Sequence, residues 1–138
     1  MRWLALFAAL ILVGCSTYDP EPSPAELRAQ WEAQNVFPAQ YKNDLLAFLR
    51  TYLNNPEHVR SGALAPPTLL KVGPGQRYVA CLRYNARDSE NHYMGPKEGA
   101  AVYVSGRLDQ FLDQRQVVKD LCKDAAFAPF PELEKLTR

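Results

Sequence analysis

The chain has 138 residues, of which 22% are charged and 47% are hydrophobic, and its 16 basic side chains nearly balance its 15 acidic ones. The length predicts one small domain with short appendages. The composition excludes a disordered tail, a collagen-like repeat and a strongly basic nucleic-acid-binding protein.

The N-terminus begins with Met1 and Arg2, followed by an uncharged apolar run from Trp3 to Val13. One positive charge before a short apolar run is typical of a secretory signal peptide. The run is too short for a spanning helix, which needs about 20 apolar residues. We therefore expect residues 1–14 to be a signal peptide that is removed.

The apolar run ends in Leu12-Val13-Gly14-Cys15. This sequence resembles the lipobox of bacterial lipoproteins, in which a leucine and two small or aliphatic residues precede an obligatory cysteine. The resemblance implies that the Cys15 thiol carries a diacylglyceryl group, and that the amino group released by cleavage is often acylated, for example with palmitate. Two or three acyl chains hold a protein firmly at a membrane. The alternatives are an ordinary secretory signal with an accidental cysteine and a short buried helix.

The residue after Cys15 is Ser16 and not aspartate. In Gram-negative lipoproteins an aspartate here tends to retain the protein at the inner membrane. In a Gram-negative host the resemblance therefore implies an outer-membrane anchor with the domain facing the periplasm. Loss of Arg2 leaves 15 of the 16 basic residues against 15 acidic ones. The bulk charge of the mature chain thus gives no support for binding to nucleic acid or anionic lipid.

Residues 15–23 contain alternating prolines, which favour an extended tether, and residues 24–138 are expected to form a single domain. Ser23-Pro24-Ala25-Glu26 is a helix start, with serine as the N-cap and glutamate three residues later, and this helix is predicted to run to about Gln34. Between Pro38 and Asn54 apolar residues recur at the spacing of an amphipathic helix.

Beyond Pro56 the pattern changes to strands. The longest expected strand alternates, with Tyr78, Ala80, Leu82 and Tyr84 on one face. The expected strands are Val59–Leu64, Thr68–Val72, Arg77–Arg87, Lys97–Ser105 and Arg107–Leu112.

A short helix over Gln114–Ala125 and the tail Phe127–Leu136 are expected to close the chain. The predicted fold class is α+β, with two N-terminal helices, an antiparallel β-meander and a short C-terminal helical segment.

Three cysteines are present. If Cys15 is acylated, Cys81 and Cys122 remain as an even pair in an oxidising compartment, where disulfides persist. We expect a disulfide that fastens the C-terminal region to the sheet, and the alternative is two buried free thiols. His58 and His92 lie far apart in sequence and neither cysteine has a ligand-type neighbour, so a zinc site is not expected.

No sequence motif indicates catalysis. Asp88, Ser89 and His92 share a polar loop, but this grouping is more typical of loop composition than of a catalytic triad. The loop also lacks the glycine and the glutamate that a calcium loop needs. Gly73-Pro74-Gly75 leads into a strand rather than a helix, and its proline removes an amide that would bind phosphate. We expect no enzyme, metal or cofactor.

A candidate binding patch flanks the central hairpin and its loop. Arginine, methionine and aromatic residues are enriched in the buried centres of protein interfaces. The alternative is a simple solvated loop. The patch consists of Arg83, Arg87, His92, Tyr93 and Met94.

The segment from Arg77 to Asp109 and the ending Pro-Phe-Pro-Glu-Leu-Glu-Lys-Leu resemble those of small, uncharacterised lipoproteins of alphaproteobacteria. The resemblance implies an envelope location, and since no activity is assigned to these proteins it implies nothing about function. The leading hypothesis is a lipid-anchored, non-catalytic envelope protein that binds an envelope protein partner. The alternative is a periplasmic inhibitor of a secreted enzyme such as lysozyme, with Ser105-Gly106 as the inserted loop. A third hypothesis, a cryptic hydrolase, requires two acids or a serine–histidine pair in one pocket.

Overall fold

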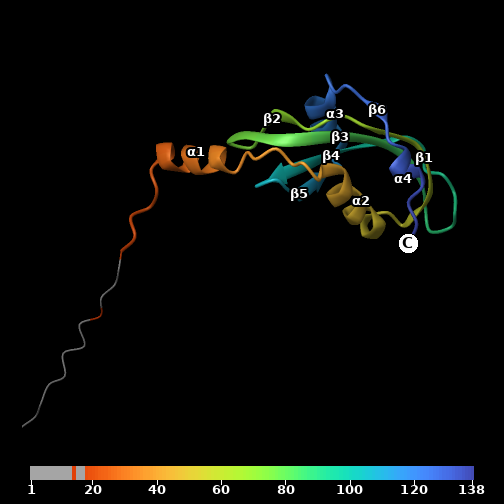
Figure 1. Cartoon of the computed structure of the whole chain (residues 1–138), viewed down its shortest axis with the longest axis horizontal. Helices are drawn as coiled ribbons and strands as arrows, with labels where there is room; N and C mark the ends of the chain where they lie inside the picture. Colours follow the sequence, from red (N-terminus) through yellow and green to blue (C-terminus); the bar gives the residue numbers. More distant parts are fainter. Residues whose placement is uncertain (1–13, 15–17) are drawn as a thin grey trace, which may run out of the picture.

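The computed structural model describes Gly14 and residues 18–138 (Figure 1). The predicted acylation site Cys15 and residues 1–13 of the predicted signal peptide lie outside the described residues. The elements in chain order are α1 (Pro24–Ala33), α2 (Tyr41–Tyr52), β1 (Asn55–Leu64), β2 (Thr68–Val72), β3 (Gly75–Arg87), β4 (Lys97–Val104), β5 (Arg107–Leu112), α3 (Arg115–Cys122), β6 (Ala128–Pro129) and α4 (Pro131–Glu134).

The strands form one antiparallel sheet in the order β5-β4-β3-β1-β6. β2 pairs with Gly75–Val79 of β3, and β1 pairs with the later part of the same strand from Leu82. β4 pairs with Tyr78–Tyr84 along the other side. The predicted α+β class is therefore confirmed, with β3 as the strand that joins the two halves of the sheet.

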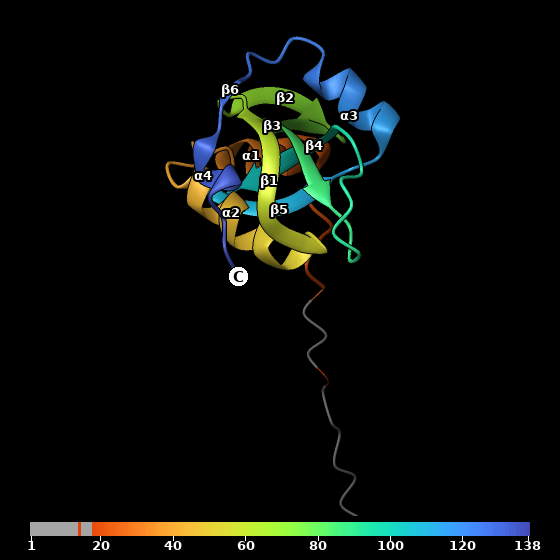
Figure 2. The ribbon, with the colours of Figure 1, turned by 90° about the vertical axis from the view of Figure 1, so that its right-hand side faces the viewer.

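Helices cover both faces of this sheet: α2 and α4 lie on one face and α3 on the other (Figure 2). Both faces are covered because successive side chains of β3 alternate between them, as predicted, and both sets are apolar. Ala80 and Leu82 face different layers from Val79 and Cys81, and the first pair packs with α2 while the second packs with α3. Each face of β3 thus supplies apolar surface to its own core.

The predicted disulfide is present and joins these layers. Cys81 of β3 is bonded to Cys122 at the end of α3, with 5.8 Å between their Cα atoms and a sequence separation of 41. It fastens α3 to the centre of the sheet.

β1 differs most from its predicted extent, because it begins at Asn55 and not at Val59. His58 and Ser61 have φ angles of 58° and 55°, and the pairing register with β3 shifts on both sides of Arg60. These β-bulges insert extra residues into the strand, so the regular alternation of apolar and polar residues used to predict its extent does not hold there. Pro56 is tolerated in β1 because it lies at the start of the strand.

The end of the chain also adds an unexpected strand. β6 pairs with Ala63 and Leu64 of β1 before α4 begins. The α4 residue Leu133 is fully buried beside Phe130 in the core with α2. α3 ends at Cys122 and not at Ala125. The predicted bounds of β2 and β5 are confirmed.

α1 begins as predicted, with the Ser23–Glu26 capping box, but it buries no residue. It is held at its C-terminal end by Trp31, whose indole N–H donates to the Gln76 carbonyl at 2.8 Å. The Arg77 guanidinium stacks 3.5 Å from the centre of the Trp31 ring and donates to the Trp31 carbonyl at 2.7 Å. A Cβ on Gly75 would lie 2.5 Å from the indole nitrogen of Trp31. We call Trp31, Gly75 and Arg77 the α1 clamp.

We expect Arg77→Met to release α1 while leaving the sheet intact. Arg77 is only 5% exposed and its methylene stem is replaced by a similar apolar volume, but its hydrogen bonds to α1 are lost. Hydrogen exchange of the α1 amides should show a loss of protection of about 2 kcal/mol. Leu27→Ala, a half-exposed position on the same helix, is the control and should keep the protection. Unchanged exchange in Arg77→Met would show that the clamp does not hold α1.

Candidate functional site

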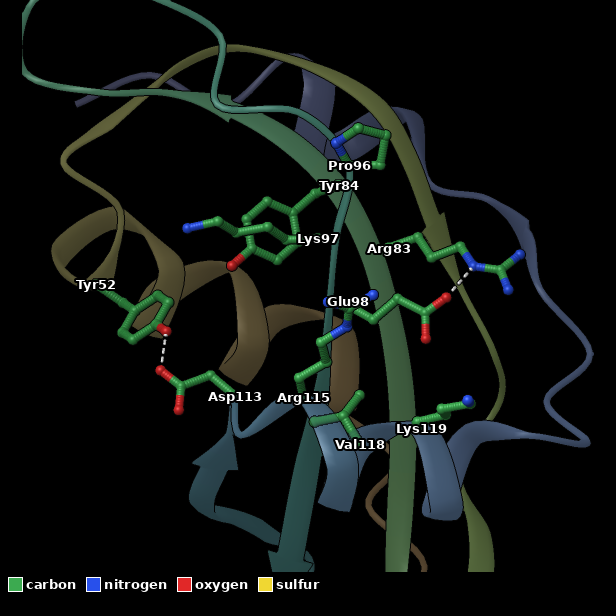
Figure 3. Close-up of a pocket in the computed structure, with 10 residues that line it drawn as sticks. All are labelled: Tyr52, Arg83, Tyr84, Pro96, Lys97, Glu98, Asp113, Arg115, Val118 and Lys119. Carbon is green, nitrogen blue, oxygen red and sulfur yellow. Dashed lines mark hydrogen bonds and ion pairs between the residues drawn. The ribbon is translucent and has the colours of Figure 1, made fainter.

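A pocket of about 720 Å³ opens at one edge of the sheet (Figure 3). β5 ends opposite Ala100, so in the described part of the chain no strand pairs with β4 residues 97–99 on the side away from β3. The chain crosses this gap from β5 to α3. We call this cavity the edge pocket; it is lined by Tyr52, Arg83, Tyr84, Pro96, Lys97, Glu98, Asp113, Arg115, Val118 and Lys119.

The two carboxylates of the edge pocket are both engaged. Glu98 Oε1 lies 2.7 Å from Arg83 Nε, its neighbour across the β3–β4 pair. Asp113 Oδ2 accepts a hydrogen bond of 2.6 Å from the Tyr52 hydroxyl (Figure 3). The edge pocket therefore holds two acids, as the hydrolase hypothesis requires, and each of them is bound to a neighbouring side chain.

Basic side chains outnumber these acids in the edge pocket. Besides Arg83, the lining includes Lys97, Arg115 and Lys119. Among the described residues, these three have no carboxylate within the 4.0 Å of an ion pair. The edge pocket therefore carries a formal excess of two positive charges in a mature chain that is predicted to be neutral overall.

An aromatic cluster fixes the wall of the edge pocket. The rings of Tyr52, Phe48 and Phe111 lie with their centres 5.0 to 5.3 Å apart. Phe111 crosses directly over Gly99, where any side chain would collide with the ring. Burial, together with the hydrogen bond to Asp113, raises the pKa of Tyr52 above its ordinary value.

A second surface forms around Tyr93, at the end of the 88–96 loop. The Tyr93 hydroxyl donates to the His58 carbonyl at 2.7 Å. The Arg60 guanidinium lies 4.0 Å from the ring centre, and that of Arg87 lies 5.9 Å from it. Met94 is 42% exposed next to them. We call Arg60, Arg87, Tyr93 and Met94 the Tyr93 surface.

The structure divides the patch predicted from sequence. Arg87 and Tyr93 are brought together and form a β-bridge. Arg83 lies four residues earlier on β3, at the edge pocket, with its guanidinium 3.9 Å from the centre of the Phe127 ring. His92 points to solvent within 3.9 Å of Asp88 and 3.7 Å of Glu90.

Sequence reasoning missed Arg60. It lies between the two register shifts of β1, with its guanidinium over the Tyr93 ring. The Nε atom of Arg87 is buried and has no hydrogen-bond partner among the described residues. No local sequence signal marks either feature.

Two further predicted features have structural roles. Asp88 Oδ1 accepts hydrogen bonds of 2.9 Å from the backbone N–H groups of His92 and Glu90. These bonds lower the pKa of Asp88 and close the loop. In the Ser105-Gly106 turn, the Ser105 amide donates to the Gln34 carbonyl at 2.7 Å. Val36 lies against Gly106, so the turn is packed on the α1–α2 connection.

Within the described ranges, no group of three or more His, Cys, Asp or Glu side chains is arranged to hold a metal ion. No helix there is both long enough and apolar enough to cross a bilayer. Comparisons with protein-family models, curated proteins and solved structures found no match to this chain.

The Tyr52–Asp113 hydrogen bond predicts an alkaline effect on stability. The fold raises the pKa of Tyr52. The stability that the protonated Tyr52 hydroxyl contributes is therefore fully present below the pKa of an unfolded tyrosine, about 10, and is lost as the pH rises further. Between neutral pH and about pH 9, the difference in free energy of unfolding between wild type and Tyr52→Phe should be constant. Above about pH 10 the wild type should lose stability relative to the variant.

The measurement is denaturant unfolding across this pH range. Tyr18→Phe, at an exposed tether position, is the control and should follow the wild type throughout. If wild type and Tyr52→Phe stay parallel into strongly alkaline solution, the Tyr52 hydroxyl is not held protonated by the fold.

Proposed function

We propose that this protein is a lipid-anchored cell-envelope protein that binds another envelope protein through the Tyr93 surface, without catalysing a reaction. The anchor is the predicted acylated Cys15. In a Gram-negative host the proposed location is the outer membrane, with the domain facing the periplasm.

The observation that carries this proposal is the separation of the tether from the Tyr93 surface. The tether leads into α1 at one end of the domain, and the 88–96 loop lies at the other end (Figure 1). Gln76 of β3 contacts α1, whereas Arg87 of the same strand bridges to Tyr93. The interval between them corresponds to about 36 Å of extended strand. A chain anchored before the tether would present the Tyr93 surface away from the membrane.

The composition and rigidity of the Tyr93 surface favour binding. Tyrosine and arginine are the residues most often found at energetic centres of protein interfaces. The Tyr93 ring is fixed by its hydrogen bond to His58 and lies beside two guanidinium groups, so little side-chain freedom remains to be lost on binding. The inhibitor alternative gains no such support, because the Ser105-Gly106 turn is packed against Gln34 and Val36.

Replacing the predicted acylation site should detach the protein from membranes. Cys15→Ala removes the thiol that receives the lipid, so the protein should become soluble or remain unprocessed. Membrane fractionation and the mass of the N-terminal peptide report this. Ser16→Ala is the control and should stay in the membrane fraction. Normal cleavage with undiminished membrane association in Cys15→Ala would contradict the lipid anchor.

The binding partner is tested by crosslinking in intact cells, affinity capture and mass spectrometry. We expect a discrete envelope protein whose recovery falls at least about tenfold in Tyr93→Ala, as for a residue at the centre of an interface. Leu27→Ala, at an exposed position on α1, is the matched control. Capture of bulk lipoproteins only, or equal capture by Tyr93→Ala, would overturn the proposed binding surface.

A further inference from the structure

We propose that the edge pocket binds a phosphomonoester, with Arg115 as the residue that contacts the phosphate directly. This site adjoins the Tyr93 surface, since Lys97 Nζ lies 4.0 Å from Met94 Sδ, but no residue belongs to both, and the proposal does not depend on the proposed protein partner. Its volume of about 720 Å³ is within the range of pockets that enclose small molecules.

The charge of the edge pocket matches this class of ligand. Its four basic and two acidic side chains leave a formal excess of two positive charges. A phosphomonoester carries a charge of about −1.5 to −2 at neutral pH, so one such group neutralises the excess. A monovalent anion would leave part of it uncompensated.

Arg115 is placed to make the direct contact. Its side chain extends from the start of α3 into the middle of the edge pocket, with Lys97 and Lys119 on either side of it (Figure 3). The planar guanidinium offers paired donors that fit phosphate oxygens. Because α3 has no acidic side chain in its first turn, nothing in that turn offsets the positive end of the helix.

Neither carboxylate of the edge pocket forms an ion pair with Arg115, because both have other partners. Glu98 is taken by Arg83 at 2.7 Å, and Asp113 is taken by the Tyr52 hydroxyl. Glu98 nevertheless lies in the same pocket and repels an incoming anion. Glu98 therefore lowers the affinity for an anion, whereas Arg115 raises it. Neutral substitutions at the two positions should change the affinity in opposite directions.

The binding test uses the mature acylated protein in detergent micelles, with glucose 6-phosphate as the probe and glucose 6-sulfate as the monovalent analogue. Calorimetric titration should show saturable binding of the phosphate, weaker binding of the sulfate, and a loss of affinity for the phosphate as the pH falls below about 6, where it loses a charge. Short-chain phosphatidic acid, compared with phosphatidylcholine of the same chain length in the same micelles, distinguishes a lipid headgroup from a free phosphomonoester as the source.

The variants make the assignment specific. Arg115→Gln should lower the affinity at least about tenfold, since hydrogen bonds between charged groups are the strongest of their kind. Glu98→Gln should raise the affinity. Lys123→Gln, at the other end of α3 and outside the edge pocket, is the control and should not change it.

Three results would overturn the proposal. These are the failure of both glucose 6-phosphate and short-chain phosphatidic acid to bind, equal binding of the phosphate and the sulfate, and binding that Arg115→Gln leaves unchanged. Because Arg115 and Glu98 are on the surface, circular dichroism of each variant should match the wild type. Tyr93→Ala should retain phosphate binding, which keeps this test separate from the test of the protein partner.

Discussion

The alternation of β3 is the constraint on which the rest of the structure depends. This strand is buried on both faces and pairs with β2, β1 and β4, so it belongs to both cores at once. The Cys81–Cys122 bond adds a covalent link between β3 and α3. For a loop of this length, the chain-entropy model gives a stabilisation of about 4 kcal/mol. A small domain with two thin cores gains from such a link.

β3 also sets the positions of the α1 clamp, the edge pocket and the Tyr93 surface. Its start holds α1 through Gln76 and Arg77, its middle supplies Arg83 to the edge pocket, and its end brings Arg87 beside Tyr93. The tether and the Tyr93 surface are therefore held apart by one continuous strand. This arrangement suits a protein that is held by one end and binds with the other.

Local signals in the sequence were sufficient for α1, α2, α3 and most strands, but not for α4 or β6. The Ser23 capping box, the helical spacing before Asn54 and the alternation of β3 each depend on neighbouring residues. The candidate sites depend on distant ones: Tyr52 meets Asp113 across 61 residues, and Arg60, between the register shifts of β1, lies over the Tyr93 ring. Such contacts follow from strand register, which a single sequence does not specify.

In the proposed orientation, the tethered end lies near the membrane and the Tyr93 surface lies away from it. Energy transfer to acceptor lipids tests it directly, with a donor dye on Leu27→Cys of α1 or on Met94→Cys of the Tyr93 surface, in acylated protein bound to vesicles. Both positions are about half exposed, so labelling should not disturb the core. We expect clearly stronger transfer from position 27 than from position 94. Equal transfer, or stronger transfer from position 94, would contradict it.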